Sequence, residues 1–218
     1  MERNTACLAH TELFQGIPPE KIESVLREAG ALRRSYRKKE TVCRAGDTME
    51  ALGMVLQGGV NIEHDDLWGG RSILAHISPG EIFAETYACI PGEVLMVSAV
   101  ASEDSEILFL DIRRVAGNGL YQRLAQNLLT LLAKKTLTLT RRILHTSPKS
   151  IRGRLTAYLT FQAKKQGSLT FTIPFDRQQL ADYLGVDRSA LSSELSAMQR
   201  EGLLTFRKNR FSILLPEP

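Results

Sequence analysis

The pattern of apolar and polar positions over residues 176–204 predicts two short helices joined by a tight turn. Asp176 stands at the first N-cap position, and Gln179 three residues later completes a capping box. Gly185 is the residue type with which a helix ends in a left-handed turn, and Asp187 is placed to cap the second helix. Apolar residues recur at helical spacing in both segments: Leu180, Ala181, Leu184, Leu191, Leu195 and Met198.

The polar side of the second predicted helix is built from small residues and one arginine: Arg188, Ser189, Ser192 and Ser193. In a helix-turn-helix, this part of the second helix meets base edges in the major groove of DNA. Residues 203–215 then show two apolar runs around a basic turn, which predicts a β-hairpin wing. An ordinary helical hairpin is the alternative. The two caps, the glycine turn, the small polar face and the basic wing together favour a winged helix-turn-helix that binds DNA.

The first half of the chain shows a different pattern. Short helices are predicted over residues 11–32, and then short apolar runs alternate with turn residues roughly every eight to twelve positions. The candidate strands are residues 35–38, 41–43, 53–57, 60–64, 71–77, 97–101 and 105–111. Many short strands at this spacing predict a β-barrel, sandwich or roll.

A long helix is predicted between these regions, from Leu120 to His145. Its apolar stripe is too wide for one sheet to cover, and contains Leu124, Leu128, Leu131, Leu132 and Leu139. Such a stripe is typical of a dimerisation helix, and a helix that lies on the β-domain is the alternative. The expected domains are residues 1–117, 118–146 and 147–218.

Charge divides unevenly along the 218 residues. Residues 1–111 hold 18 acidic and 10 basic residues, and residues 112–218 hold 6 acidic and 18 basic ones. No acid lies between Asp111 and Asp176. Because a solvated helix face normally mixes both signs, this run favours a polyanionic partner, although pairing with the acidic half is also open.

Targeting and redox signals are few. The sequence contains no apolar run of about 18 residues and no apolar signal segment, so we expect a cytoplasmic protein that does not enter a membrane. Three widely spaced cysteines, Cys7, Cys43 and Cys89, fit neither a disulfide framework nor a zinc motif. We expect reduced thiols.

Three motifs resemble the Crp/Fnr superfamily of bacterial transcription regulators. They are residues 56–60 (LQGGV), residues 79–85 (PGEIFAE) and residues 177–195 (RQQLADYLGVDRSALSSEL). The resemblance implies an α+β fold with an N-terminal antiparallel β-roll of cupin or jelly-roll type, a long dimerisation helix and a C-terminal winged helix-turn-helix. It also implies a homodimer, a palindromic double-stranded DNA site, an effector pocket between β-roll and helix, and RNA polymerase as a candidate partner.

The resemblance also assigns roles within the DNA-binding region. Arg188 matches the base-reading arginine of the family, which can form a bidentate contact with guanine. Ser189 and Ser193 stand where several members carry Glu and Arg, so we expect a different half-site. The residues placed for phosphate contacts are Arg177, Gln178, Arg207, Lys208 and Arg210.

The β-roll departs from the cyclic-nucleotide sensors of the family. Their phosphate-binding Arg-Ser pair corresponds to Leu95 and Met96, and no arginine lies between Arg71 and Arg113. An unpaired buried anion would cost several kcal/mol, so we predict that cyclic AMP does not bind. An iron–sulfur centre needs a cysteine cluster, and only Cys7 lies in the N-terminal arm.

The remaining candidate pocket has mostly apolar walls, which suit a small apolar or aromatic effector. Its residues are Phe83, Glu85, Tyr87, Leu95, Met96 and Val97, with Leu132, Thr136 and Leu139 on the helix. The alternatives are a plain core in a constitutive regulator, or a haem or redox sensor that uses His64, His76 or Cys89. An enzyme and a protein-docking module are further alternatives; no catalytic spacing or metal motif in the sequence supports an enzyme.

Overall fold

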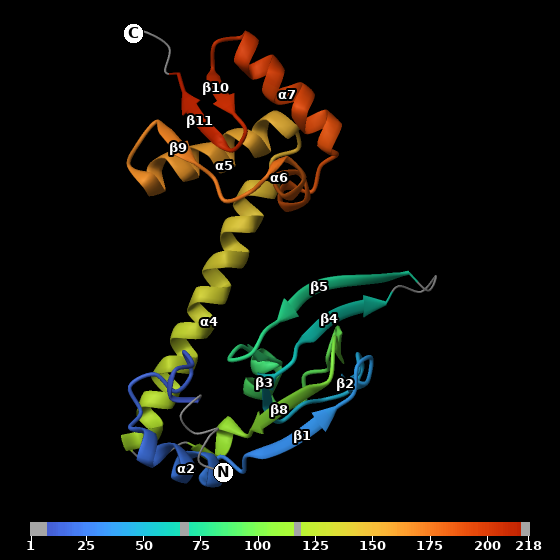
Figure 1. The fold of residues 1–218 in the computed structure, drawn as a ribbon, viewed down its shortest axis with the longest axis vertical. Coiled ribbons are helices and arrows are strands. Elements are labelled where there is room, and N and C mark those ends of the chain that lie inside the picture. The colour runs from blue at the N-terminus through green and yellow to red at the C-terminus, as the bar shows by residue number, and fades with distance from the viewer. Residues whose placement is uncertain (1–7, 66–69, 116–118, 215–218) are drawn as a thin grey trace. The chain divides into compact units, whose positions relative to one another are not determined.

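The computed structural model describes residues 8–65, 70–115 and 119–214. The chain divides into two compact units, Met1–Ala133 and Lys134–Pro218 (Figure 1). Each unit has its own hydrophobic core. Helix α4, Gly119–Thr146, runs from the first unit into the second and matches the predicted long helix. The expected boundary at residues 117 and 118 lies outside the described residues. No helix in the described part of the chain is long and apolar enough to cross a membrane.

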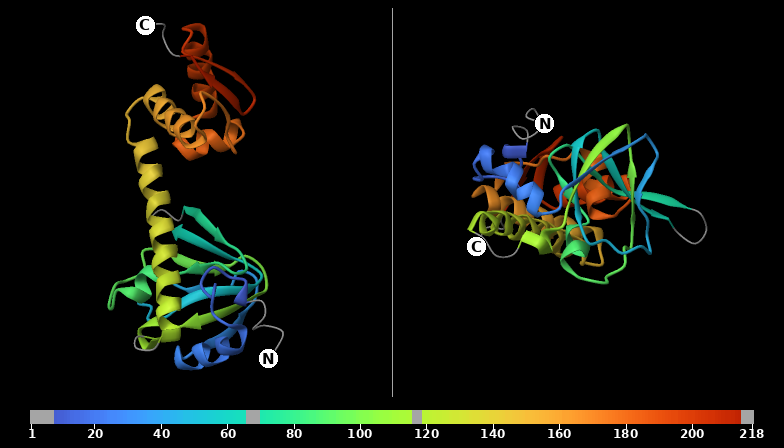
Figure 2. Two further views of the ribbon diagram at one scale, coloured as in Figure 1. Left: turned by 90° about the vertical axis from the view of Figure 1, so that its left-hand side faces the viewer. Right: turned by 90° about the horizontal axis from the view of Figure 1, so that it is seen from below.

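The first unit contains two four-stranded antiparallel sheets, which confirms the predicted β-domain (Figures 1 and 2). One sheet has the order β1-β8-β3-β6 and the other β2-β7-β4-β5. The strands are β1 Leu32–Tyr36, β2 Thr41–Cys43, β3 Leu52–Gln57, β4 Val60–Asp65, β5 Arg71–Ile77, β6 Ile82–Phe83, β7 Ser98–Ala101 and β8 Ser105–Leu110. Side chains from both sheets meet in a buried cluster that includes Tyr36, Val55, Val60, Phe83 and Ile107.

Apart from the first, the predicted strands agree with the structure to within one residue at each end, and three elements differ from the prediction. The first strand begins at Leu32, three residues before the prediction, and ends at Tyr36. Strand β6 and the five-residue helix α3, Glu85–Cys89, were not predicted. Both elements are too short for a period of two or of 3.6 residues to become visible in the sequence.

The glycine pair in the turn between β3 and β4 has a steric cause. Gly58 has a φ of 80°, and a Cβ atom there would overlap the Ser105 hydroxyl and the Asp104 carbonyl. The Ser105 Oγ atom accepts a hydrogen bond from the Gly59 N–H at 3.1 Å, and its proton is within reach of the Glu103 carbonyl at 2.7 Å and the Gly59 carbonyl at 3.0 Å. Only glycine fits the turn at Gly58, which explains part of the LQGGV motif.

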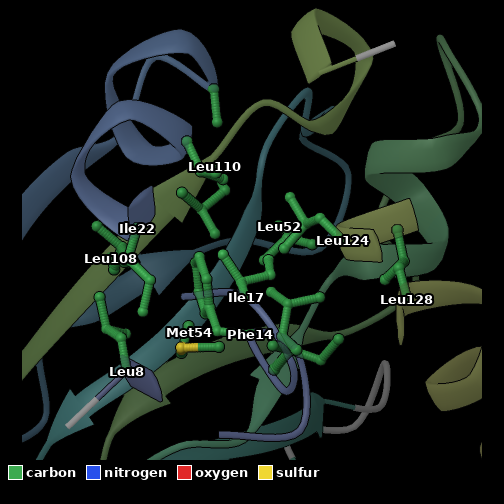
Figure 3. Packing of buried hydrophobic residues seen from close by; sticks show 14 of the residues in the cluster. Leu8, Phe14, Ile17, Ile22, Leu52, Met54, Leu108, Leu110, Leu124 and Leu128 are labelled. Carbon is green, nitrogen blue, oxygen red and sulfur yellow. The ribbon is translucent and has the colours of Figure 1, made fainter. Parts of the chain in front are cut away.

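A second core in the first unit joins the N-terminal segment, one sheet and the start of α4. Figure 3 shows its members packing from these three directions, among them Phe14, Ile22, Met54, Leu110 and Leu124. Helix α2, Pro19–Glu28, contributes Ile22 and Val25. The Asn127 amide of α4 donates to the carbonyls of Leu13 at 2.9 Å and Gln15 at 2.8 Å. The beginning of α4 is therefore fixed to the first unit by apolar burial and by hydrogen bonds.

This packing corrects the predicted dimer stripe. Leu124 and Leu128 are 1% and 8% exposed and belong to the core of their own chain, which leaves little surface for a second chain. Leu131 and Leu132 pack partly against the same core. Leu139, in the second unit, is 62% exposed. The periodicity identified an apolar face correctly, but it could not tell which partner covers each part of it.

The second unit is a winged helix-turn-helix. After α4 come helix α5 Ile151–Gln166, strand β9 Thr170–Thr172, helices α6 Arg177–Leu184 and α7 Arg188–Arg200, and strands β10 Leu204–Arg207 and β11 Arg210–Ile213. The three strands form an antiparallel sheet in the order β10-β11-β9, in which Phe206 lies opposite Phe211. The predicted helices and hairpin are confirmed; Leu215, the last residue of the predicted hairpin, lies outside the described residues.

Candidate nucleic-acid interface

Helix α6 begins and ends as its sequence predicts. The Asp176 carboxylate accepts a hydrogen bond from the Gln179 N–H at 2.8 Å, and the Gln179 side chain accepts from the Asp176 N–H at 2.9 Å. Gly185 follows the helix with a φ of 64°, in the left-handed region. Both ends of α6 are thus satisfied locally, so the turn to α7 has a defined geometry.

Helix α7 presents the predicted reading face to solvent. Leu191, Leu195 and Met198 are buried in the core of the second unit. Arg188 and Ser193 are exposed on the other side, near the N-terminus of the helix. The fold therefore holds α7 by its apolar face and leaves free the part that meets base edges in a helix-turn-helix.

The N-cap of α7 organises one of the serines. The Asp187 carboxylate accepts from the Ala190 N–H at 2.8 Å and also from the Ser189 hydroxyl. Hydrogen bonds from Ser189 and Ala190 hold the pKa of the Asp187 carboxyl below its ordinary value. Ser192, by contrast, is half-buried and donates to the Arg188 carbonyl at 2.9 Å. The hydroxyl protons of Ser189 and Ser192 are thus used in hydrogen bonds within α7 and its N-cap, to Asp187 and to the Arg188 carbonyl respectively.

Two arginines that the sequence analysis did not single out brace the helix-turn-helix. Arg154 of α5 donates to the carbonyls of Leu184 at 2.9 Å and Gly185 at 3.0 Å, at the turn before α7. Arg152 donates to Glu194 at 2.6 Å and, through two N–H groups, to Glu201 at 2.7 Å. Their partners are 30 to 49 residues away in sequence, so spacing alone carries no signal for these contacts.

Arg177 is stacked on the wing. Its guanidinium carbon lies 5.0 Å from the centre of the Phe206 ring and 6.0 Å from that of Phe211. Burial, and then the nearby charge of Arg188, lower the pKa of Arg177. A stacked guanidinium still presents its N–H edge for bidentate contact with a phosphate. Gln178 is less free, because its amide donates to Asp182 at 2.8 Å.

The wing adds exposed cations to the same unit. Arg207, Lys208 and Arg210 are exposed, and Lys208 occupies the tight turn with a φ of 55°. The Asn209 amide ties this turn to the Ile173 carbonyl at 3.0 Å. Among the described residues, none of these three cations, nor Arg188, lies within ion-pair distance of an acid. Unpaired cations on exposed loops are suited to a phosphate backbone.

The predicted effector-pocket residues have several different environments. Phe83 belongs to the core between the two sheets, and a Cβ atom on Gly53 would overlap its ring. Leu95 is buried, and Met96 is 69% exposed. The Tyr87 hydroxyl accepts from the Met96 N–H at 3.3 Å, so the structure brings these two residues together. The prediction that Phe83 lines a pocket is wrong: its side chain is buried in the core between the two sheets.

The other predicted pocket residues come from both units. Glu85 is buried at the start of α3, and Val97 is half-buried just before β7. Leu132 is half-buried in the first unit, whereas Thr136 and Leu139 are exposed in the second. Leu95 has no guanidinium group that could bind a phosphate. Its backbone N–H donates to the Asp47 carbonyl and its carbonyl accepts from the Gly46 N–H, both at 2.8 Å.

The haem and redox candidates also have defined surroundings. Burial raises the pKa of the Cys43 thiol to about 11, and burial followed by the charge of Glu85 raises that of Cys89. Thiols with raised pKa values are poor nucleophiles and poor metal ligands at neutral pH. His64 and His76 are exposed, and the His76 Nδ1 atom lies 2.8 Å from the Asn61 amide oxygen. Cys7 lies outside the described residues.

A buried histidine is the other feature that the sequence did not reveal. His145, at the end of α4, is 3% exposed and lies against the rings of Tyr158, Phe161 and Tyr183. Its Nδ1 atom is 2.8 Å from the Tyr183 hydroxyl. Burial, and then the charge of Arg141, lower the pKa of His145. The aromatic partners lie on α5 and α6, whereas His145 lies on α4, so no local pattern predicts the cluster.

The class of protein follows from three features: a capped helix-turn-helix, a basic wing and an antiparallel β-domain. Together they are the features of a DNA-binding regulator with a separate β-domain. Two family models match the chain: a cyclic nucleotide-binding domain over residues 33–117 and a Crp-like helix-turn-helix domain over residues 153–218. The chain is 32% identical over 195 residues to the cyclic AMP receptor protein of Thermus thermophilus, covering 88% of this chain and 87% of that protein. It therefore belongs to the Crp/Fnr superfamily of transcription regulators, which are not enzymes.

Two further comparisons agree with this assignment. The transcriptional activator protein FnrL of Cereibacter sphaeroides is 23% identical over 193 residues, with 83% of this chain and 75% of that protein covered. The crystal structure of the Thermus thermophilus catabolite activator protein superposes with a TM-score of 0.51 at 26% identity, and 94% of each chain is covered. The likeness extends over both units of the chain.

Proposed function

We propose that this chain is a dimeric, sequence-specific DNA-binding regulator that recognises a palindromic site and responds to a small effector other than cyclic AMP. The observation that carries the DNA part is the exposed N-terminal face of α7 beside a wing with unpaired cations. Arg188 is placed to read a base edge, and Arg177, Arg207, Lys208 and Arg210 are placed to bind phosphates. Ser189 and Ser193 complete the reading face, and Gln178 is a weaker candidate because its amide already bonds to Asp182.

The test of the DNA part is a binding titration on double-stranded DNA at several salt concentrations. Each phosphate neutralised by the protein releases condensed counterions, so the logarithm of the association constant should fall linearly with the logarithm of salt. Sequences selected from a random pool should contain two related half-sites whose centres are about 10 base pairs, or a multiple of that spacing, apart. Binding that is independent of salt and of sequence would contradict the proposal.

The proposed dimer rests on exposed apolar side chains of α4. Leu129, Leu137, Leu139, Ile143 and Leu144 are each more than half exposed. At about 100° per residue, the five side chains fall within one arc of about 160° on the helix. Large apolar side chains gathered on one side of a helix indicate a partner, and a second copy of the same helix fits a self-complementary apolar seam.

Solution mass measurements test the dimer. Leu139→Glu and Ile143→Glu place charges within the proposed seam, so each variant should shift the chain from dimer to monomer in analytical ultracentrifugation. Thr138→Glu is the matched control, because Thr138 is exposed on the opposite side of the same helix and its hydroxyl donates only to the Lys134 carbonyl. A wild-type monomer at micromolar concentration, or equal behaviour of all three variants, would contradict the dimer.

The proposed effector is distinguished from cyclic AMP by charge. The Thermus thermophilus relative is named a cyclic AMP receptor protein, but the family's phosphate-binding Arg-Ser pair is Leu95 and Met96 in this chain. A phosphate beside buried Leu95 would lose hydration without gaining a guanidinium partner. Titration calorimetry with cyclic AMP should give no heat of binding at micromolar concentration, and a micromolar dissociation constant would refute this part.

The residues proposed to face such an effector are Glu85, Tyr87, Met96, Val97 and Leu132, all in the first unit. Native mass spectrometry of freshly prepared protein, with an absorbance spectrum for haem, identifies a ligand that remains bound. A retained small molecule supports the effector. A chain that carries no ligand and binds DNA without any addition favours the second candidate, a constitutive regulator. The burial of Phe83 and Leu95 supports this candidate, because it fills part of the predicted pocket with core side chains. The proposed protein partner for activation is RNA polymerase, and reconstituted transcription tests it.

A further inference from the structure

The two exposed serines at the start of α7 differ in what their hydroxyl groups are free to do. The Ser189 hydroxyl donates to the Asp187 carboxylate, whereas no hydrogen bond from the Ser193 hydroxyl is formed within the described residues. Ser192 lies between them in sequence, is half-buried and donates to the Arg188 carbonyl. Of these three serines, only Ser189 and Ser193 are therefore exposed for contact with a base edge.

The direction of the Ser189 hydrogen bond is fixed by chemistry. An ionised carboxylate can only accept hydrogen bonds, so the proton between the two groups belongs to the Ser189 hydroxyl. The same carboxylate accepts from the Ala190 N–H at 2.8 Å, which orients it at the N-terminus of α7. The Ser189 oxygen is left with its lone pairs toward solvent and no free proton. It can accept a hydrogen bond from a partner, but it cannot donate one without losing its bond to Asp187.

In the major groove, adenine presents an amino donor at N6 and cytosine presents one at N4, whereas guanine O6 and thymine O4 only accept. Resting on the DNA-binding function proposed above, we infer that Ser189, held by Asp187, selects an adenine or cytosine at one position of each half-site. Guanine or thymine there would set two acceptors against each other. Ser193 has a hydroxyl that rotates freely and both donates and accepts, so it should tolerate all four bases at its position.

The size of the effect follows from a single hydrogen bond. A net contribution of about 1 kcal/mol corresponds to a preference of about fivefold for the matching bases. This is smaller than the discrimination expected from a bidentate arginine, so the two contributions can be separated in one motif. The position should also remain visible at high salt, because the contact with a base does not depend on counterion release.

The experiment is selection of binding sequences from randomised double-stranded DNA with the full-length chain and three variants. Ser189→Ala removes the acceptor, and Asp187→Gly removes the carboxylate while keeping a residue that helices tolerate well at the N-cap. Ser193→Ala is the matched control, since it deletes the exposed hydroxyl that is not held. Thermal melting of each variant verifies that the fold is retained, and the Arg188-dependent position of the motif provides an internal reference.

The wild-type motif should contain one position per half-site at which adenine and cytosine are enriched about fivefold over guanine and thymine. That preference should disappear in Ser189→Ala and in Asp187→Gly and persist in Ser193→Ala, while the Arg188-dependent position is retained in all three. A motif that is identical in wild type and Ser189→Ala, or a Ser189-dependent preference for guanine or thymine, overturns the inference and leaves the DNA-binding function intact. If no motif is enriched and binding does not depend on salt, the proposed function fails and the inference fails with it.

Discussion

The paired arginines of the first unit contrast with the unpaired cations on the proposed DNA-binding face of the second. In the first unit, Arg71 lies 2.8 Å from Asp65 and 3.3 Å from Glu63, and Arg113 lies 3.0 Å from Glu50. In the second, Arg188 and Lys208 are exposed without an acidic partner among the described residues. Exposed ion pairs contribute little to stability, so the difference matters for binding more than for folding. A surplus of one sign becomes a binding surface only where local pairing leaves it free.

Arg152 shows the limit of this contrast. It belongs to the basic unit, but its three hydrogen bonds to Glu194 and Glu201 make it a brace between α5 and α7. Those bonds hold the pKa of the Glu201 carboxyl below its ordinary value. The charge count of a segment therefore overstates the number of cations available to DNA, and each arginine must be placed individually.

The largest effect is expected from a buried apolar side chain of the first unit. Leu124→Ala removes a fully buried side chain from the core of the first unit and should lower the free energy of unfolding by about 2–5 kcal/mol. Leu32→Ala is the control, because Leu32 is 48% exposed and should cost less than about 1 kcal/mol. Denaturant titrations at one fixed protein concentration measure both. Equal losses would mean that Leu124 is not a core residue.

The next effect concerns the reading face of the second unit. Arg188→Ala should reduce discrimination between the selected site and random DNA by about 1–3 kcal/mol, because a bidentate contact to a base edge is lost. Affinity for random DNA should change by only the share that one cation contributes. Competition binding with both DNAs gives the ratio. A proportional loss on both would show that Arg188 contacts phosphates instead.

A smaller effect separates paired from unpaired cations. Lys208→Ala should weaken binding to all sequences and reduce the slope of the salt dependence by about one, since one phosphate contact disappears. Arg71→Ala, which removes a paired cation from the first unit, should leave that slope unchanged. Anisotropy titrations over a range of salt concentrations test both variants. A changed slope for Arg71→Ala would break the proposed division between the two units.

The same contrast explains how far the sequence could predict the structure. In the second unit, caps, turn glycine and apolar spacing act over a few residues, so α6, α7 and the wing could be placed nearly residue by residue. In the first unit, the strands were visible but their pairing was not, because β1 pairs with β8 across more than 60 residues. Strand β6 likewise pairs with β3, and the Phe83 ring lies over Gly53 of that strand, so local pattern could not place them.

Site residues divide along the same line. Arg188 and Ser193 were predicted from local pattern and are exposed as expected, whereas the hydrogen bond between Ser189 and Asp187 is evident only in the structure. The brace formed by Arg152 and Arg154 and the cluster around His145 join segments that are far apart in sequence. A sequence pattern shows which face of an element is apolar, but tertiary packing decides which partner covers that face.

The smallest expected effect is a pH dependence that arises in the second unit. His145 is buried among aromatic rings there, whereas His10, His64 and His76 of the first unit are exposed. Burial disfavours the charged imidazole, and Arg141 adds positive charge nearby, so the pKa of folded His145 lies below its ordinary value of 6.5. In the unfolded chain the same histidine takes up a proton at a higher pH. The stability that this histidine contributes is therefore present above about pH 6.5 and is lost as the pH falls through its folded pKa.

Unfolding measured at pH 7.5 and at pH 5.5 should accordingly show a larger loss for the wild type than for His145→Gln. His76→Gln is the control, since an exposed histidine hydrogen-bonded to Asn61 should leave the difference unchanged. The groups that face His145, namely the Tyr183 hydroxyl, the rings of Tyr158 and Phe161, and Arg141, supply no carboxylate that could stabilise the imidazolium. If His145→Gln loses as much stability on acidification as the wild type, the pH dependence arises from the carboxylates, whose paired members lie in both units.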